Sequence, residues 1–327
     1  MLNILIFRTD RIGDLIYTCP TILTIKKYFE NSKITLITSD KNNEYAKTLN
    51  IFHEIIKYPK KNIFIKAKFL IDLSKKKFNY IFVLDGKERS ILSTLLIKAD
   101  KKIALCQKIN FYYKFFNIKF IEENKKSNLS EAFQEVLYYC KINTKINNYD
   151  FISKKIDNKF SLNIPIKSYV HIHLDEKWVN SLYIKTYTDI DPNYKSFVNF
   201  LESINIKNNI LITTGLNSFD LIENLKNHYL NKKSKNIFFK DNSFTSIYLV
   251  FKPSFEDLES LLRNSKILIS CHGALLHASN SFNIKKIDIF EKDKKSFYSK
   301  YASHIKNYFP IYRSSFDIMK NDIFKNL

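Results

Sequence analysis

Short, strongly apolar runs alternate with helical patterns along this chain, and this alternation restricts its fold more than any other feature. The first three runs are LNILIF at residues 2–7, KITLIT at 33–38 and YIFVLDG at 80–86. Between and after them, apolar residues recur at helical spacing, as at Ile22 and Ile25. Strands that alternate with helices favour parallel sheets built from βαβ units. The sequence therefore predicts an α/β fold.

The same pattern restarts in the second half of the chain. A polar, Asn- and Lys-rich interval at about 141–166 lacks clear periodicity and indicates a connection between domains. After it come an amphipathic helical pattern at 255–265 and four further predicted strands, at 168–174, 208–214, 266–271 and 285–290. A chain of 327 residues also exceeds the usual domain size of about 100–200 residues. We therefore predict two domains, 1–155 and 156–327, with a cleft between them that is lined by the carboxyl ends of strands.

Charge narrows the range of partners. The chain has 53 Lys and Arg against 32 Asp and Glu, a formal net charge of +21. This excess favours nucleic acid, phospholipid headgroups or a phosphorylated glycan as the partner. No apolar run approaches the roughly 18 residues that span a bilayer, and no basic leader precedes the apolar start of the chain. We therefore expect neither a membrane span nor a signal peptide, and a cytoplasmic location.

The spacing of cysteines and histidines predicts no metal site. The four cysteines are widely separated, at Cys19, Cys106, Cys140 and Cys271. Without a CxxC pair, they fit buried thiols better than a zinc site or a disulfide framework. His171 and His173 share one face of a predicted strand, but no cysteine or carboxylate stands at a ligand spacing from them.

The segment that ends the first predicted strand, RTDRIGD, carries several side chains that could bind a ligand. Arg8 and Arg11 could bind anions, and Gly13 permits a tight turn. A helix is expected to follow, with Pro20 in its first turn, where the missing N–H has no partner in any case.

Asp14, the last residue of this segment, has two alternative roles. It could act as a general base if a substrate hydroxyl lies within hydrogen-bond reach. It could instead cap the following helix, a role that aspartate serves well. The residues alone leave both roles open.

A second polar segment, SCHGALLH at 270–277, also joins a strand to a helix. Free N–H groups at a helix start bind phosphate well, and Gly273 would let a ligand approach the backbone closely. His272 is expected to point into the cleft, whereas His277 could be a core histidine with satisfied hydrogen bonds. Lys177, which follows the strand at 168–174, could neutralise a diphosphate or could be a solvated lysine.

Together these segments resemble glycosyltransferase family 9, the heptosyltransferases of lipopolysaccharide core assembly. ILIFRTDRIGDLIYTCPTILTIKKYF is similar to the family's opening strand, Arg, Gly-Asp pair and Pro-led helix, and FNYIFVLDGKERSILSTLL to a later strand and helix. In the second half the similar segments are YVHIHLDEKW, ILITTG and SFEDLESLLRNSKILISCHGALLHASNSFNIKKIDIF. The order and spacing of five segments carry the resemblance, which covers most of the chain.

The resemblance implies a GT-B architecture, in which two Rossmann-like domains face each other across a cleft. Residues 1–155 would bind the acceptor and residues 156–327 the nucleotide sugar, while residues 311–327 could pack back on the first domain. It also implies an inverting, metal-independent transfer of heptose or a related sugar. No cofactor is implied beyond the nucleotide-sugar co-substrate, with ADP-heptose as the donor by analogy.

The resemblance also implies roles for individual residues. Asp14 stands where the family's proposed catalytic base stands, which favours the base over the cap, and Lys177 stands at its diphosphate-binding lysine. The acceptor side would include Arg8, Arg11 and Gly13. The donor side would include, besides Lys177, the residues Thr214, Gly215, Cys271, His272, Gly273, Ala274 and His277.

One departure from the family pattern leaves the donor sugar open. The family usually has Asp-Ser/Thr-Gly before the last helix and a histidine three residues past the glycine. Here the triplet is Cys271-His272-Gly273, and His277 lies four residues past the glycine. His272 could donate to a sugar carboxylate or phosphate that an aspartate would repel.

Two lysine-rich segments with aromatic residues, at 57–77 and 107–120, suggest how an acceptor could be met. Basic amphipathic segments can lie on an anionic membrane surface. The alternative is a core-facing helix and a buried aromatic cluster under a lysine-rich exterior. The first reading fits a lipid-linked or phosphorylated glycan acceptor and a peripheral location on the inner face of the bacterial inner membrane.

A basic single-stranded nucleic-acid-binding protein without catalysis is the rival function. The net charge favours it, and so do 20 tyrosines and 28 phenylalanines that could stack on bases. The chain carries no recognised DNA- or RNA-binding motif, however, and this function leaves the strand-end residues unexplained. We therefore expect no nucleic-acid partner. A third alternative is a degenerate transferase that binds a sugar nucleotide without turning it over.

Overall fold

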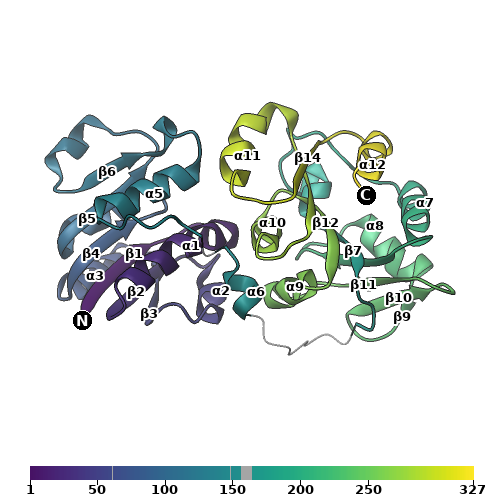
Figure 1. The fold of residues 1–327 in the computed structure, drawn as a ribbon, viewed down its shortest axis with the longest axis horizontal. Helices are drawn as coiled ribbons and strands as arrows, with labels where there is room; N and C mark the ends of the chain where they lie inside the picture. The colour runs from purple at the N-terminus through teal and green to yellow at the C-terminus, as the bar shows by residue number, and fades with distance from the viewer. Residues whose placement is uncertain (61, 148, 156–163) are drawn as a thin grey trace. The chain divides into compact units, whose positions relative to one another are not determined.

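The structure is a computed structural model that describes residues 1–60, 62–147, 149–155 and 164–327. The chain forms two compact units, Met1–Phe151 and Ile152–Leu327, each with its own sheet (Figure 1). The predicted domain boundary after residue 155 adjoins residues 156–163, which lie outside the described residues. The same holds for part of the predicted connection at 141–166.

The first unit is built on a six-stranded parallel sheet with the order β3-β2-β1-β4-β5-β6. Its strands are β1 (Leu2–Phe7), β2 (Ser32–Thr38), β3 (Glu54–Lys57), β4 (Lys77–Val83), β5 (Lys98–Cys106) and β6 (Lys119–Glu122). The order reverses between β1 and β4. At such a switch point the loops after two neighbouring strands leave in opposite directions, and ligands of open α/β sheets bind there.

Helices and short turns connect these strands. They are α1 (Ile12–Tyr28), α2 (Asn43–Thr48), α3 (Ile63–Ser74), α4 (Glu88–Ser93), η1 (Thr94–Leu96), η2 (Phe111–Phe115), η3 (Glu123–Lys125) and α5 (Leu129–Tyr139). α1 begins eight residues before Pro20, so the prediction of Pro20 in the first turn was wrong. Gly13 lies in that first turn, and the predicted tight turn is absent there.

The second unit contains an eight-stranded sheet with the order β14-β13-β12-β7-β8-β11-β10-β9. β9 and β10 run antiparallel to their neighbours, and the other pairs are parallel. The strands are β7 (Tyr169–Leu174), β8 (Asn209–Thr214), β9 (Asn231–Lys232), β10 (Ile237–Asp241), β11 (Ser246–Val250), β12 (Ser265–Cys271), β13 (Lys285–Phe290) and β14 (Tyr308–Tyr312). The switch point lies between β7 and β12.

Seven helices and four short turns complete the described part of the chain from residue 151 onward. The helices are α6 (Phe151–Lys155), α7 (Tyr194–Asn205), α8 (Asp220–Asn224), α9 (Phe255–Leu262), α10 (Ala274–Ser279), α11 (Lys295–Ala302) and α12 (Phe316–Phe324). The turns are η4 (Glu176–Trp178), η5 (Asn180–Leu182), η6 (Leu225–Tyr229) and η7 (Lys292–Lys294). In the described residues, no helix has the length and apolar character needed to cross a bilayer.

The last helix, α12, packs on the core of its own unit. Phe316, Met319 and Ile323 are buried there, and the Phe316 ring lies 5.4 Å from the rings of both Phe197 and Phe200 of α7. The spacing of these three residues gives α12 one apolar stripe, which the second unit buries. α12 therefore belongs to the core of the second unit, and the alternative in which residues 311–327 pack back on the first domain stays a prediction.

Replacing Met319 by alanine should destabilise the second unit by about 2–5 kcal/mol, because it leaves a cavity in the core. The adjacent Ile318 is 63% exposed, so Ile318→Ala should change stability by at most about 0.5 kcal/mol. Trp178 is the single tryptophan and is fully buried in this unit, so its fluorescence during urea unfolding reports on the second unit. Equal midpoints for both variants would contradict the packing of α12.

Candidate functional site

Arg8 organises the carboxyl edge of the first sheet at its switch point. The side chain is buried directly after β1, where Nε donates to the backbone oxygen of Asp14 at 3.1 Å and Nη1 donates to that of Leu84. Burial alone would lower the pKa of Arg8, but nearby carboxylates raise it above its usual value. These carboxylates belong to Asp10, Asp14, Asp85 and Glu123. Arg8 is therefore a buried, permanently charged anchor for this loop, with little surface left for an acceptor.

Asp14 makes the helix-cap interaction and also keeps an accessible face. Its Oδ2 accepts from the backbone N–H of Arg11 at 3.1 Å, which satisfies one of the free donors at the start of α1. Its Oδ1 lies 3.8 Å from the Arg8 guanidinium, and one third of the side chain is exposed. The cap and the base are therefore compatible roles for one carboxylate.

Asp10 is a second carboxyl group in this loop that the sequence analysis did not select. Burial raises its pKa to about 7, with Asp14 and Asp85 adding to the rise and Arg8 and Lys87 opposing it. The side chain pairs with Arg8 at 3.3 Å between Oδ1 and Nε. A carboxyl group of this kind can take up or release a proton near neutral pH.

The other cationic side chains at this edge differ in how available their charged groups are to a ligand. Arg11 is exposed and makes no ion pair with a described residue. Lys87 and Arg89 instead reach back to Thr9, whose backbone oxygen accepts from Lys87 Nζ at 2.7 Å. Asp85 ties this loop together, because its Oδ2 accepts from both the N–H and the hydroxyl of Thr9. Arg11 is therefore the predicted acceptor-side cation that remains available to a ligand.

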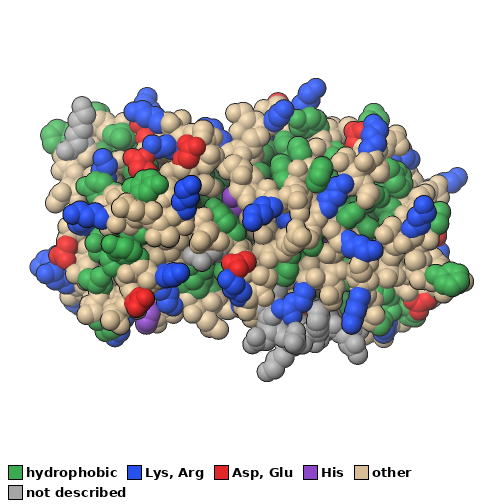
Figure 2. All heavy atoms as spheres, viewed as in Figure 1, with side chains coloured by type: hydrophobic (Ala, Val, Ile, Leu, Met, Phe, Trp, Pro, Cys, Tyr) green, Lys and Arg blue, Asp and Glu red, His purple; other side chains and the backbone are tan. Residues whose placement is uncertain are grey.

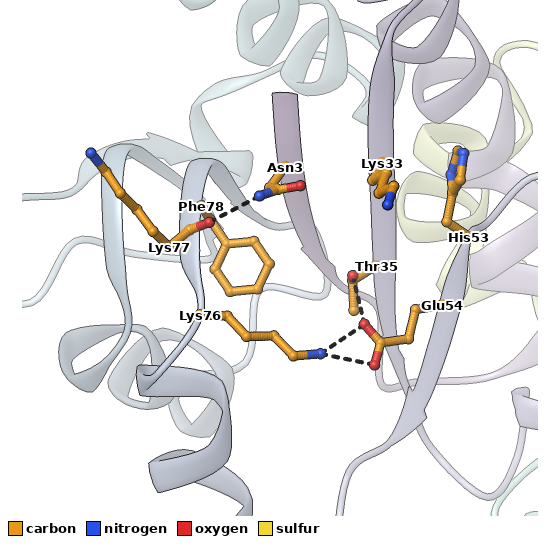
Figure 3. Close-up of a pocket in the computed structure, with 8 residues that line it drawn as sticks. All are labelled: Asn3, Lys33, Thr35, His53, Glu54, Lys76, Lys77 and Phe78. Atoms are coloured by element: carbon orange, nitrogen blue, oxygen red, sulfur yellow. Dashed lines mark hydrogen bonds and ion pairs between the residues drawn. The ribbon is translucent and has the colours of Figure 1, made fainter. Parts of the chain in front are cut away.

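A pocket of the first unit lies at the opposite edge of the sheet, where the strands begin (Figure 3). Lys76 crosses it to Glu54, with its Nζ 2.9 Å from both carboxylate oxygens, and Thr35 also donates to Glu54. Lys76, Glu54 and Thr35 pair with one another through hydrogen bonds. Ligands of parallel sheets bind at the carboxyl edge, which is the opposite one. We therefore assign this pocket no role.

In the second unit, Lys177 lies against the backbone of Gly273. A Cβ atom on Gly273 would be only 2.8 Å from Lys177 Nζ, so the absence of a side chain there makes room for the ammonium group. Lys177 forms an ion pair with the buried Asp175. Burial opposes the charge of Lys177, but Asp175 outweighs it and raises the pKa of Lys177 above its usual value. The structure thus brings together two predicted donor-site residues that are 96 positions apart.

Thr214 and Gly215 determine the backbone conformation at the end of the neighbouring strand, β8. They present little side-chain surface to a ligand. The buried Thr214 hydroxyl accepts from the backbone N–H of Lys252 at 2.8 Å and donates to the oxygen of Gly215 at 3.2 Å. A Cβ on Gly215 would come within 2.9 Å of Asp175 Cβ and 3.1 Å of its Cα. Gly215 therefore lets the loop after β8 lie on the residue that holds Lys177.

Cys271 ends β12 and is buried beneath the same site. Burial raises the pKa of its thiol, which therefore stays protonated at neutral pH. Arg313, which follows β14, donates to the thiol at 3.8 Å and to the backbone oxygen of Lys177 at 2.5 Å. Arg313 also pairs with Glu291 at 3.2 Å, so it fixes three loops of this edge. Nothing in the local sequence pattern around Arg313 marks it as a site residue.

His272, Gly273 and Ala274 form the partly exposed end of the β12 loop. His272 turns toward Asp288 of β13, with 2.7 Å between its Nδ1 and Asp288 Oδ2. His277 is buried in α10, with its ring edge-on to that of His272 at 5.4 Å. α10 has six residues, so its N-terminus is too short a helix to serve by itself as an anion site.

His171 and His173 point to the same hydroxyl, that of Thr213, at 2.8 Å and 2.9 Å. Burial lowers the pKa of His171 to about 3 and that of His173 to about 4, so both are neutral at physiological pH. No cluster of three or more metal-ligating side chains occurs among the residues that the structure describes. The two histidines are therefore hydrogen-bonded core residues of β7.

A pocket of about 380 Å³ opens between the loops that follow β7 and β8. Ser181, Asn193, Tyr194, Ser218 and Asp220 are among its lining residues. These loops leave the carboxyl edge of the sheet, where Lys177 and Gly215 also lie. The second unit thus has both a pocket and a partly buried cation at the edge that ligands of such sheets use.

Solved structures with the same fold cover the whole chain. E. coli heptosyltransferase WaaC, solved with ADP, is 14% identical, with 100% of each chain covered and a TM-score of 0.68. A glycosyl transferase family 9 protein from Veillonella parvula is 13% identical over 99% of this chain and 88% of its own, with a TM-score of 0.63. A UDP-GlcNAc 2-epimerase from Methanocaldococcus jannaschii is 12% identical, covering 99% and 92%, with a TM-score of 0.58.

At these identities the similarity shows the fold, which is the two-domain GT-B fold that the sequence predicted. No protein-family model matches the sequence. No curated protein is similar to it at a significant level.

Proposed function

We propose that this protein is a glycosyltransferase that takes a sugar from a nucleoside-diphosphate donor. The observation that carries the proposal is the partly buried Lys177 ammonium group, which lies against the side-chain-free backbone of Gly273 at the switch point of the second sheet. A diphosphate placed there would meet a fixed positive charge. The fold shared with heptosyltransferases, one of them solved with ADP, supports the same assignment.

The proposed reaction is an inverting, metal-independent transfer. An acceptor hydroxyl oxygen attacks the anomeric carbon while the bond from that carbon to the diphosphate oxygen breaks. The hydroxyl proton passes to the Asp14 carboxylate, and the bonding electrons leave with the diphosphate, where Lys177 offsets the developing charge. Heptose or a related sugar is the proposed group, and a lipopolysaccharide core or another surface glycan the proposed acceptor.

The first unit supplies the features that this base needs. The cap interaction with Arg11 and the ion pair with Arg8 hold the Asp14 carboxylate in one orientation. The neighbouring Asp10, whose burial raises its pKa to about 7, can receive the proton afterwards. Acceptor binding falls to the exposed Arg11 and to the backbone around Gly13, while Arg8 positions the loop.

Nucleoside diphosphates and nucleotide sugars, ADP-heptose among them, should raise the melting temperature of the wild-type protein by binding its folded state. The rise should disappear in Lys177→Ala. It should persist in Lys207→Ala, which removes an exposed lysine just before β8, at the opposite edge of the sheet. Each shift is measured against the ligand-free variant, so any destabilisation by the unpaired Asp175 is accounted for.

The same experiment separates the proposal from the nucleic-acid alternative. No shift with any nucleotide, together with salt-dependent binding of oligonucleotides, would favour that alternative. On the visible face of each unit, the Lys and Arg side chains of the described residues are scattered among other side chains (Figure 2). A stabilising nucleotide sugar that is never turned over would instead indicate a degenerate transferase.

Asp14→Asn should lower the rate of sugar transfer by about 10²–10⁴-fold, the range for loss of a general base. Asparagine keeps a side-chain oxygen that can accept from the Arg11 N–H, so the cap and the melting temperature should be retained. The assay uses the donor found by thermal stabilisation, with lipopolysaccharide core oligosaccharide as acceptor. Asp72→Asn, at an exposed carboxylate of α3, is the control. A normal rate in Asp14→Asn would remove the base assignment, and a loss of stability alone would leave only the cap.

We further propose that the first unit docks on the anionic cytoplasmic face of the inner membrane. The two lysine-rich segments contain both buried and exposed apolar side chains. Leu73 of α3 and Tyr113 of η2 are buried in the core, whereas Phe64, Phe111 and Phe115 are 77–83% exposed. Exposed phenylalanines next to exposed lysines suit a surface of lipid headgroups and acyl chains.

Phe115→Ser should weaken binding to phosphatidylglycerol-containing vesicles by about tenfold, because a phenylalanine side chain leaves the acyl region. Phe244→Ser is the control, since Phe244 is 97% exposed but lies in the second unit. Vesicle sedimentation at low and high salt measures both variants, and salt should weaken the lysine contribution. An equal loss in the two variants would contradict docking through the first unit.

A further inference from the structure

A buried carboxylate stands behind His272. Asp288 lies in the middle of β13, opposite Ser270 of β12 and Pro310 of β14, and is fully buried. Its Oδ2 interacts with His272 Nδ1 at 2.7 Å and accepts from the Tyr308 hydroxyl at 2.8 Å. A carboxylate in such a position is costly unless it is both hydrogen-bonded and paired with a positive charge.

The neighbouring lysine does not supply that charge. Lys286 is on the same face of β13, two residues before Asp288, and is also buried. Its ammonium group donates to the backbone oxygens of Phe282, Ile284 and Lys306, at 2.8–3.2 Å. His272 is therefore the titratable group that directly faces Asp288 and can carry its counter-charge.

This arrangement leaves one nitrogen of His272 for a ligand. Nδ1 is occupied by Asp288, and Nε2 makes no hydrogen bond with a described residue, while the side chain is 12% exposed. The Tyr298 ring of α11 lies 4.5 Å from the imidazole between centroids and limits its rotation. The next residue along the chain is Gly273, whose backbone faces the Lys177 ammonium group.

We propose that His272, oriented by Asp288, binds an anionic group of the donor as a second cation beside Lys177. The inference rests on the proposed function and adds a substrate class to it. The anion has two sources, the diphosphate itself or an acidic group on the transferred sugar. Asp288 is a positioning residue, because it acts through His272 and does not touch the ligand.

Anion binding at Nε2 is coupled to the uptake of a proton. Only the doubly protonated imidazole donates from both nitrogens, one to Asp288 and the other to the ligand. Affinity for the anion should therefore fall as pH rises. The groups that face His272 are Asp288 from β13, Tyr308 from β14, Tyr298 from α11, His277 from α10 and, beyond it, His304.

Titration calorimetry between pH 7 and 9 tests the proposal, since diphosphates are almost fully ionised over that range. The probes are a nucleoside diphosphate, its neutral hexose conjugate and its hexuronic acid conjugate, with the base chosen by the thermal panel. His272→Gln keeps a hydrogen-bonding side chain but cannot be protonated. We expect it to lose at least tenfold in affinity at pH 7 and to abolish the pH dependence. His228→Gln, at an exposed histidine of η6, should behave as wild type.

Asp288→Asn should weaken the same interaction, and restoring a carboxylate with Asp288→Glu should recover part of it. Dependence on His272 for all three probes identifies the diphosphate as the anion, and dependence for the hexuronic acid conjugate alone identifies the sugar. Unchanged affinity and pH profile in His272→Gln would overturn the inference while leaving the proposed function intact. Absence of binding by any probe to the wild-type protein would overturn both.

Discussion

The site of the second unit depends on one largely buried ion pair, between Lys177 and Asp175. Neither charge could stay in this position alone, because an unpaired buried ion costs several kcal/mol. Asp175 is held in turn by the close approach of the β8 loop, which Gly215 permits. The first unit also has a cation paired with carboxylates, because Arg8 is buried among several of them. In both units a charged side chain is held at the switch point, where the loops after two neighbouring parallel strands leave in opposite directions. The other side chains at each edge are arranged around that charge.

These fixed charges explain why the net charge of +21 says little about function. Most lysines are exposed and solvated, and exposed ion pairs contribute little to stability. The cations fixed at the two edges, Arg8, Lys177 and Arg313, are few and largely buried, and each has a carboxylate partner. An isolated basic patch would attract any polyanion, whereas a buried and oriented cation favours an anion of one size in one place. The geometry thus favours a small diphosphate over a nucleic-acid strand.

The apolar runs allowed the strands around both sites to be predicted, because such strands are buried on both faces whatever lies around them. β1 and β13 were predicted to the residue, whereas α1 begins eight residues before the predicted turn at Pro20. A buried proline inside a helix gives the sequence no start signal, and the true start is set by Asp14 bonding to Arg11. Asp288 and Arg313 were missed because their roles depend on strand order. Only the sheet places Asp288 between His272 and Tyr308, residues 36 positions apart.

This strand end carries Cys271 and His272 where the family that the sequence resembles usually has an acidic residue, and this difference changes the charge balance there. An acid at position 271 would be buried beside Asp175 and would compete for the charges of Lys177 and Arg313. The neutral, protonated thiol does not compete for these charges, so Arg313 can form its bonds to the loops of this edge. The negative charge lies instead one strand away, at Asp288, where it acts through an imidazole. The ligand would then contact the positively charged imidazole of the His–Asp pair, whereas an acidic residue would have presented a negative carboxylate. This edge should therefore favour donors with more negative charge.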